Sequence, residues 1–167
     1  MKRFLVPMLV VVLLIALVVP ANVASWEEKI TGGGQAVAGG IYFSITVSAW
    51  TADEGGAAGG QMQYSRVGQS VPDLSVHAKI QCVGINNLAD GTVVAIVAGP
   101  ADVQNDPGGQ IGSGNWMIVE ILEGGIGSGD QVSVRLCSEA NAPYKCENPS
   151  GSYPGLIYDG NFNIRSK

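Results

Sequence analysis

The chain has 167 residues, 14% of them charged, with fourteen Asp and Glu against nine Lys and Arg. Its length fits a single domain. The acidic balance argues against nucleic acid and anionic membrane surfaces as partners, because both are bound through clusters of Lys and Arg.

The N-terminus has the pattern of a secretory signal peptide. Two basic residues precede an apolar run over residues 4–19, and Pro20 ends that run before small residues that offer a cleavage site. We expect a signal peptide over residues 1–24 and one all-β domain over residues 25–167, secreted or at the exterior of the cell envelope. The alternative is an uncleaved anchor, which would be the only contact with a membrane.

Alternation of apolar and polar residues predicts β-strands along most of the mature chain. The clearest alternating segments are Ile41 to Trp50 and Leu74 to Cys82, and the latter is followed by the almost wholly apolar run Thr92 to Ala98. We expect Asp73 to Ala98 to form a long hairpin with both arms in the core, turning at Asn86 to Gly91. Further strands are expected over residues 61–66, 115–123, 131–137 and 161–164.

Glycine-rich loops separate these strands. The chain contains 24 glycines, most of them at expected turns, and it shows no convincing helical period outside the leader. Short strands with Gly and Pro turns are typical of sandwiches and barrels. We therefore predict an all-β fold, an antiparallel, closed or nearly closed β-barrel of about eight strands. A β-sandwich is the alternative.

Three cysteines can form one disulfide if the chain is exported. Cys82 shares its parity with Ile80 and Val76, which predicts a buried thiol. Cys137 ends the strand over residues 131–137, on the parity opposite to the apolar, inward-facing residues of that strand. Cys146 follows a loop rich in turn residues. We therefore prefer a Cys137–Cys146 bridge with Cys82 free, while pairs that contain Cys82 remain the alternative.

Residues that could carry chemistry are few. His77 is the only histidine and lies on the polar parity of its strand, where a histidine is usually just exposed. No serine stands in a nucleophile elbow. Glu120 shares the parity of Trp116 in a strand that is apolar on both faces, and an exposed Glu120 is the favoured interpretation. We predict no catalytic residue and no cofactor.

A polar strand face is the best candidate for binding. Tyr42 and Trp50 share a parity with Ser44, Thr46 and Ser48. Such a strand can be a sugar-binding platform, and it can equally be an ordinary exposed strand. The weak candidates for a binding face are Tyr42, Trp50, His77, Trp116 and Glu120.

Metal binding has little support. Asp102, Asn105, Asp106 and Asp130 could supply oxygen ligands to calcium, but their spacing matches no EF-hand loop. The chain has no Cys-His cluster of the kind that binds zinc. We predict no metal site.

Several short pieces carry a family resemblance. They are Thr31 to Gly34, Ile41 to Val47, Gly60 to Tyr64, Val76-His77 with Ile80 and Cys82 beyond, Ala95 to Ala98, and Gly160 to Phe162. In this order the chain resembles small secreted bacterial β domains of unknown function, which are often appended to larger extracellular proteins. It departs from the pattern at Val119 to Asp130, where an Asp-Asn-Gly turn is missing. The resemblance implies a stand-alone β domain with no known chemistry.

These observations predict a non-catalytic binding or structural module of the cell exterior, whose partner is a protein or a glycan. One alternative is a small-ligand carrier, which would enclose a barrel cavity. The other is a hydrolase that uses Glu120, which would need a pocket joining two titratable side chains.

Overall fold

The computed structural model describes residues 26–52, 57–66, 72–105, 115–124, 129–138, 146 and 152–166. The expected signal peptide and residue Asp106 lie outside this described part. Within it the protein is all-β, and no helix is long and apolar enough to span a membrane. The nine strands are β1 Trp26–Ala38, β2 Ile41–Ala52, β3 Ala58–Arg66, β4 Leu74–Lys79, β5 Cys82–Asn87, β6 Val93–Asn105, β7 Asn115–Leu122, β8 Gln131–Ser138 and β9 Gly155–Ser166.

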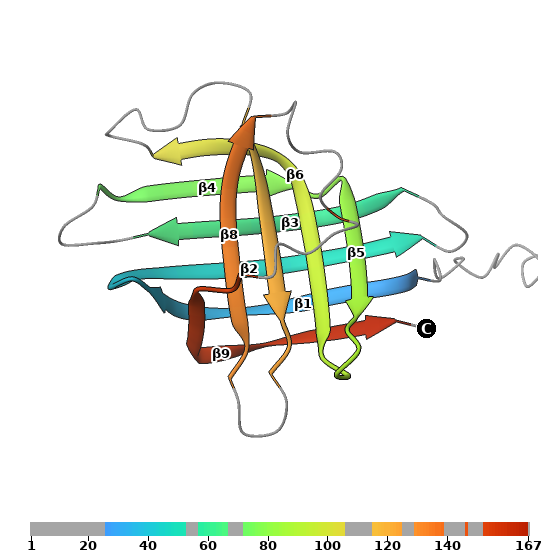
Figure 1. The fold of residues 1–167 in the computed structure, drawn as a ribbon. Coiled ribbons are helices and arrows are strands. Elements are labelled where there is room, and N and C mark those ends of the chain that lie inside the picture. Colours follow the sequence, from blue (N-terminus) through green and yellow to red (C-terminus); the bar gives the residue numbers. More distant parts are fainter. Residues whose placement is uncertain are drawn as a thin grey trace, which may run out of the picture.

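The strands form one antiparallel sheet in the order β4-β3-β2-β1-β9-β8-β7-β6-β5, and β4 also pairs with β6. Hydrogen bonds therefore run in a ring through eight strands, with β5 attached to β6 outside the ring. This confirms the predicted all-β, nearly closed fold. Figure 1 shows two layers that cross each other: layer 1 contains β1 to β4 and β9, and layer 2 contains β5 to β8. The C-terminal end of β6 bends to lie beside β4 in layer 1.

Strict alternation places the strands of layer 1. In β2 the buried residues are Phe43, Ile45, Val47 and Ala49, and every residue between them is exposed. Met62 and Tyr64 of β3 and the apolar residues of β4 are buried in the same way. Since a strand turns alternate side chains to opposite faces, the apolar half of each strand faces layer 2.

The core lies between the two layers. Layer 1 contributes Phe162, Ile30 and Ile45, all at most 1% exposed. Layer 2 contributes Met117 and Val119, which are fully buried. Removal of this apolar surface from water, worth about 25 cal/mol per Å2, is the main force that holds the layers together.

Layer 2 is also covered on its outer side. Val94, Ile96, Ala98 and Ile118 form a second apolar cluster there, together with Cys146. Residues 94–99 of β6 and residues 117–121 of β7 are therefore buried on both faces, which explains why these segments do not alternate between apolar and polar residues.

The chain passes from layer 1 to layer 2 between β4 and β5. The Ile80 N–H donates to the Gly60 carbonyl of β3 at 3.0 Å, whereas the next N–H, of Gln81, donates to Ala98 of β6 at 2.9 Å. The side-chain parity shifts by one residue at this corner. The predicted single arm from Leu74 to Cys82 is thus wrong: it is two strands in two layers, and only β5 forms the hairpin with β6.

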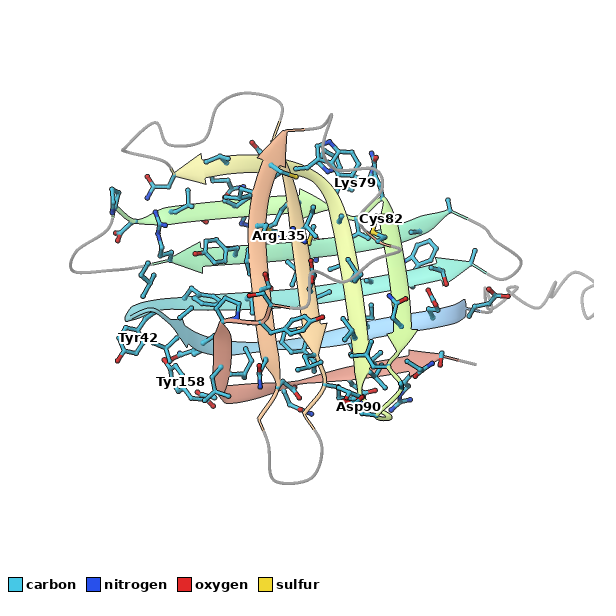
Figure 2. The ribbon with its side chains drawn as sticks, in the orientation of Figure 1. Tyr42, Lys79, Cys82, Asp90, Arg135 and Tyr158 are labelled. Carbon is cyan, nitrogen blue, oxygen red and sulfur yellow. A yellow bond between two sulfur atoms is a disulfide. The ribbon has the colours of Figure 1, made fainter. Side chains whose placement is uncertain are left out.

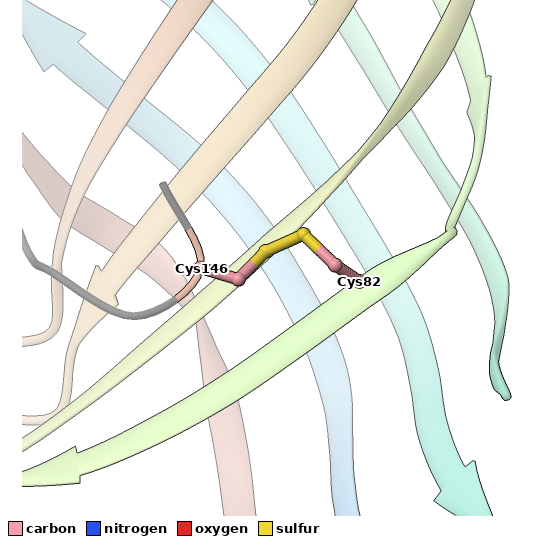
Figure 3. Close-up of a disulfide and its surroundings, with 2 residues drawn as sticks. All are labelled: Cys82 and Cys146. Carbon is pink, nitrogen blue, oxygen red and sulfur yellow. A yellow bond between two sulfur atoms is a disulfide. The ribbon is translucent and has the colours of Figure 1, made fainter. Parts of the chain in front are cut away.

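The disulfide joins Cys82 to Cys146 (Figure 3), with 6.2 Å between their Cα atoms. The predicted Cys137–Cys146 bridge and the free Cys82 are therefore wrong, and Cys137 is a half-buried free thiol. The shift at the corner turns Cys82 outward, onto the second cluster beside Cys146. Cys137 lies on β8, three strands away from β5, which is about 14 Å.

Candidate functional site

The outer side of layer 1 forms one continuous polar surface, which we call the polar face. Strand register aligns its side chains in rows that run across the strands. One row joins Thr46, Gln63, His77 and Asp102 on β2, β3, β4 and β6. The row beside it joins Ser48, Gln61 and Lys79. Such rows place side-chain hydroxyl, amide and charged groups about 5 Å apart.

A groove of about 670 Å3 opens at the centre of the polar face. Its walls carry Thr46 and Ser48 on one side and His77, Lys79 and Asp102 on the other. The lining also includes Val47, Met62, Ala78 and Pro100. Its polar side chains can exchange hydrogen bonds with a hydroxyl-rich ligand.

Two glycines let the strands approach closely at this groove. Gly60 has a φ of +124°, and a Cβ there would lie 2.9 Å from the Ala49 Cα. A Cβ on Gly99 would lie 2.7 Å from the carbonyl carbon of Lys79, where β6 turns to meet β4. Both positions require glycine, because a larger residue would push neighbouring backbones apart.

Exposed aromatic rings stand at both ends of β2. At one end, Tyr42 and Tyr158 are 58% and 53% exposed and form an edge-to-face pair with centroids 6.3 Å apart (Figure 2). The Tyr158 hydroxyl donates to Gln35 Oε1 at 2.7 Å. At the other end, Trp50 is 45% exposed.

Trp50 rests on a glycine. A Cβ on Gly59, its partner in the β2–β3 register, would lie 2.8 Å from Cε2 and 2.9 Å from Cη2 of the indole ring. Because Gly59 has no side chain, the indole ring can pack directly on the backbone of β3. One face of the ring packs on the strand, and the exposed remainder is free to stack on a ligand.

Three of the five candidate binding residues share this surface. Tyr42 and Trp50 are exposed, and half-buried His77 lines the groove. The other two, Trp116 and Glu120, lie on the outer side of layer 2, away from the polar face.

The expectation of an exposed Glu120 is wrong. The side chain is fully buried in layer 2, where Arg135 of the neighbouring strand β8 donates to its Oε1. Arg135 keeps 36% of its side chain exposed. The carboxylate is buried because the second cluster, which includes Cys146 and Tyr153, covers this side of β7.

Sequence reasoning misses two members of the polar face. Tyr158 lies in β9 beside Gln35, outside the expected strand over residues 161–164, although Leu156 and Tyr158 alternate with buried residues. Asp102 falls outside the strands expected from the sequence, because the expected hairpin ends at Ala98, but β6 extends to Asn105. The signal for this extension is the continued alternation of Ala101 and Val103.

Asp130 has a structural role. Its carboxylate accepts the Gly124 N–H at 3.0 Å and the Phe162 N–H at 2.7 Å. Among the described residues, no group of three or more His, Cys, Asp or Glu could hold a metal ion.

Two carboxyl groups show environmental effects on their pKa. Partial burial raises the pKa of Glu28, although this carboxylate also accepts a hydrogen bond from the Ile85 backbone of β5. Hydrogen bonds from Thr92 lower the pKa of exposed Asp90, whose Oδ1 accepts the Thr92 N–H at 2.9 Å. Both lie outside the groove, so neither marks it as a site of acid–base chemistry.

No known family model, curated protein or solved structure matches this chain.

Proposed function

We propose that the protein is an exported, non-catalytic module that binds an extracellular glycan through the polar face. The observation that carries this proposal is the combination of an open groove lined by hydroxyl and amide groups with exposed aromatic rings at both ends of β2. Sugars are bound by such a combination, since their hydroxyls exchange hydrogen bonds and their C–H faces stack on aromatic rings.

Two features favour binding over the alternatives. Apolar side chains fill the space between the layers. A small-ligand carrier would need a polar cavity in that space, so this arrangement disfavours the carrier alternative. Glu120 is fully buried and paired with Arg135, so a substrate has no access to it in this arrangement. Export is supported by the leader pattern, and the disulfide is compatible with an oxidising environment.

The experiment is affinity electrophoresis of the mature protein through gels that contain single soluble polysaccharides. We expect slower migration in at least one of xylan, mixed-linkage glucan, galactomannan, mannan or pullulan gels. Trp50→Ala should reduce this retardation, whereas Leu88→Ala, which removes a 37% exposed side chain from the β5–β6 turn, should not. Normal migration in all of these gels, together with capture of a protein partner, would overturn the proposal.

A further inference from the structure

We infer that the ligand is a neutral, linear polysaccharide that lies along the β2–β3 strand pair from Tyr42 to Trp50. This inference rests on the proposed glycan-binding function and adds the direction, length and charge of the ligand. It follows from the register of these two strands and from the hollows between their side chains.

The strand pair presents a single track on the polar face. Its outward residues are paired across β2 and β3 as Ser44 with Ser65, Thr46 with Gln63, Ser48 with Gln61 and Trp50 with Gly59, and Tyr42 precedes them on β2. Every partner offers a hydroxyl, an amide, an aromatic ring or bare backbone. A chain of sugars along this track would meet a repeated pair of polar groups every two residues, or about 7 Å.

Hollows follow one another along the same track. A small one of about 190 Å3 is lined by Tyr42, Ser44, Ser65 and Tyr158. The large groove begins one pair further on, at Thr46 and Gln63. The ring of Trp50 lies at the next pair beyond it. The binding surface is thus elongated along the strands.

The length of the track excludes a small sugar as the full ligand. Tyr42 and Trp50 lie eight positions apart on one strand and on one face. At about 3.3 Å per residue, their backbones are separated by roughly 26 Å. A monosaccharide or disaccharide can touch only one aromatic end, whereas a longer chain engages both, and the second contact then forms within the same complex.

The charge pattern indicates a neutral chain. The outward residues of the track carry no charge. Arg66 ends β3 opposite Phe43 and its guanidinium donates to the Pro72 carbonyl, while Lys29 on β1 and Lys79 on β4 lie on flanking strands. Asp102 stands on the same groove wall as Lys79, with the opposite sign. A polyanion or polycation would lose hydration along the track without gaining a row of counter-charges.

The first test measures the length dependence. Oligosaccharides of increasing length, prepared from the polysaccharide that retards the protein, are titrated calorimetrically into the mature protein. We expect affinity to rise at least tenfold between the disaccharide and the chain that spans both aromatic ends, and then to level off. A disaccharide that binds as tightly as the polymer would overturn the inference while leaving the glycan-binding function intact.

The second test compares the two ends. Tyr42→Ala and Trp50→Ala should each weaken binding of the long chain about tenfold, and each should leave the disaccharide bound only at the remaining end. Gly59→Ala is a matched variant, since it displaces the indole ring without removing it. It should weaken binding and shift the tryptophan fluorescence, with the β-sheet circular dichroism unchanged. If only one of the two alanine variants bound the long chain more weakly, the result would contradict a continuous track.

The third test addresses charge. Hydroxyethyl cellulose and carboxymethyl cellulose share a backbone but differ in charge, and the same comparison can be made by carboxymethylating the polysaccharide that binds. We expect the carboxymethyl form to bind at least tenfold more weakly than the neutral form. Equal or tighter binding of the acidic form would overturn the neutral assignment. Absence of binding to every polysaccharide would instead overturn the proposed function itself.

Discussion

Glu120 is the most deeply buried charged residue in the described part of the chain. Its carboxylate is fully buried, and Arg135 approaches it from the adjacent strand. Burying a charge is expensive unless a counter-charge and hydrogen bonds compensate it. The pair therefore fixes the β7–β8 register under the second cluster.

Removing the guanidinium should expose this constraint. Arg135→Met should lower the free energy of unfolding by about 3 kcal/mol, because it leaves a buried carboxylate without its cationic partner. The double variant Glu120→Gln/Arg135→Met should recover most of that loss. Urea unfolding of the four proteins in a double-mutant cycle measures both effects. If Arg135→Met and the double variant lost the same free energy of unfolding, the buried carboxylate would not need Arg135 as its counter-charge.

Tyr64 should make stability sensitive to alkaline pH. Burial raises the pKa of Tyr64 above its ordinary value of about 10, and nearby Arg66 partly opposes this. The unfolded chain then loses this proton at lower pH than the folded protein does. The contribution of protonated Tyr64 to the free energy of unfolding is therefore complete below about pH 10. It is lost as the pH rises through the pKa that Tyr64 has in the folded protein. Urea unfolding at increasing alkaline pH should show a shallower fall for Tyr64→Phe than for the original protein, and an identical fall would contradict the argument.

At the scale of elements, β2 is the strand that the sequence predicts best. It has one buried and one exposed face from Tyr42 to Trp50, so the environment of each residue there follows from parity alone. The same reasoning places Tyr42 and Trp50 on one face of a Ser/Thr strand. The β2 half of the track on the polar face therefore follows from the amino-acid pattern of a single strand.

The parts of the fold and of the candidate site that the sequence does not predict depend on contacts between distant segments. Parity cannot be carried across the corner at Ile80 and Gln81, where consecutive N–H groups bond to different layers. The Tyr158–Gln35 hydrogen bond joins residues 123 positions apart. Glu120 is buried by Cys146 and Tyr153, whose position no local pattern specifies.

The disulfide should contribute strongly to stability. It joins residues 64 positions apart, and closing a loop of that length is worth about 4 kcal/mol in the chain-entropy model. Cys82→Ser or Cys146→Ser should lower the free energy of unfolding by up to that amount, and Cys137→Ser should have a much smaller effect. Peptide mapping without reducing agent should recover the Cys82–Cys146 link. A Cys137-containing link would contradict the arrangement of layer 2.

For the whole molecule, the weakest part of the ring is the seam between β8 and β9. Among the described residues, only Gln131 and Val132 of β8 pair with β9 there. Asp130 reinforces the seam, since its carboxylate accepts the buried Phe162 N–H and its carbonyl accepts the Ile157 N–H at 2.9 Å.

Loss of the Asp130 carboxylate should open this seam. Asp130→Ala leaves the Phe162 and Gly124 N–H groups without their acceptor and should cost roughly 3 kcal/mol of unfolding free energy. Hydrogen exchange should accelerate first in β9 and at the β7–β8 turn. The control is Asp159→Ala, which removes a carboxylate from an exposed position of β9. Uniform acceleration over all strands would mean that the seam is not a separate weak point.

The pairing of β1 with β9 brings the two ends of the fold together, with Glu28 opposite Ser166. The order in which the strands follow one another is therefore not fixed by the architecture. A short linker from residue 166 to residue 26, with a new opening at the Gly39–Gly40 turn, would keep every strand beside its present neighbours. Such a circular permutant would also place both new ends near Tyr42, which offers a way to attach a reporter at that end of the track.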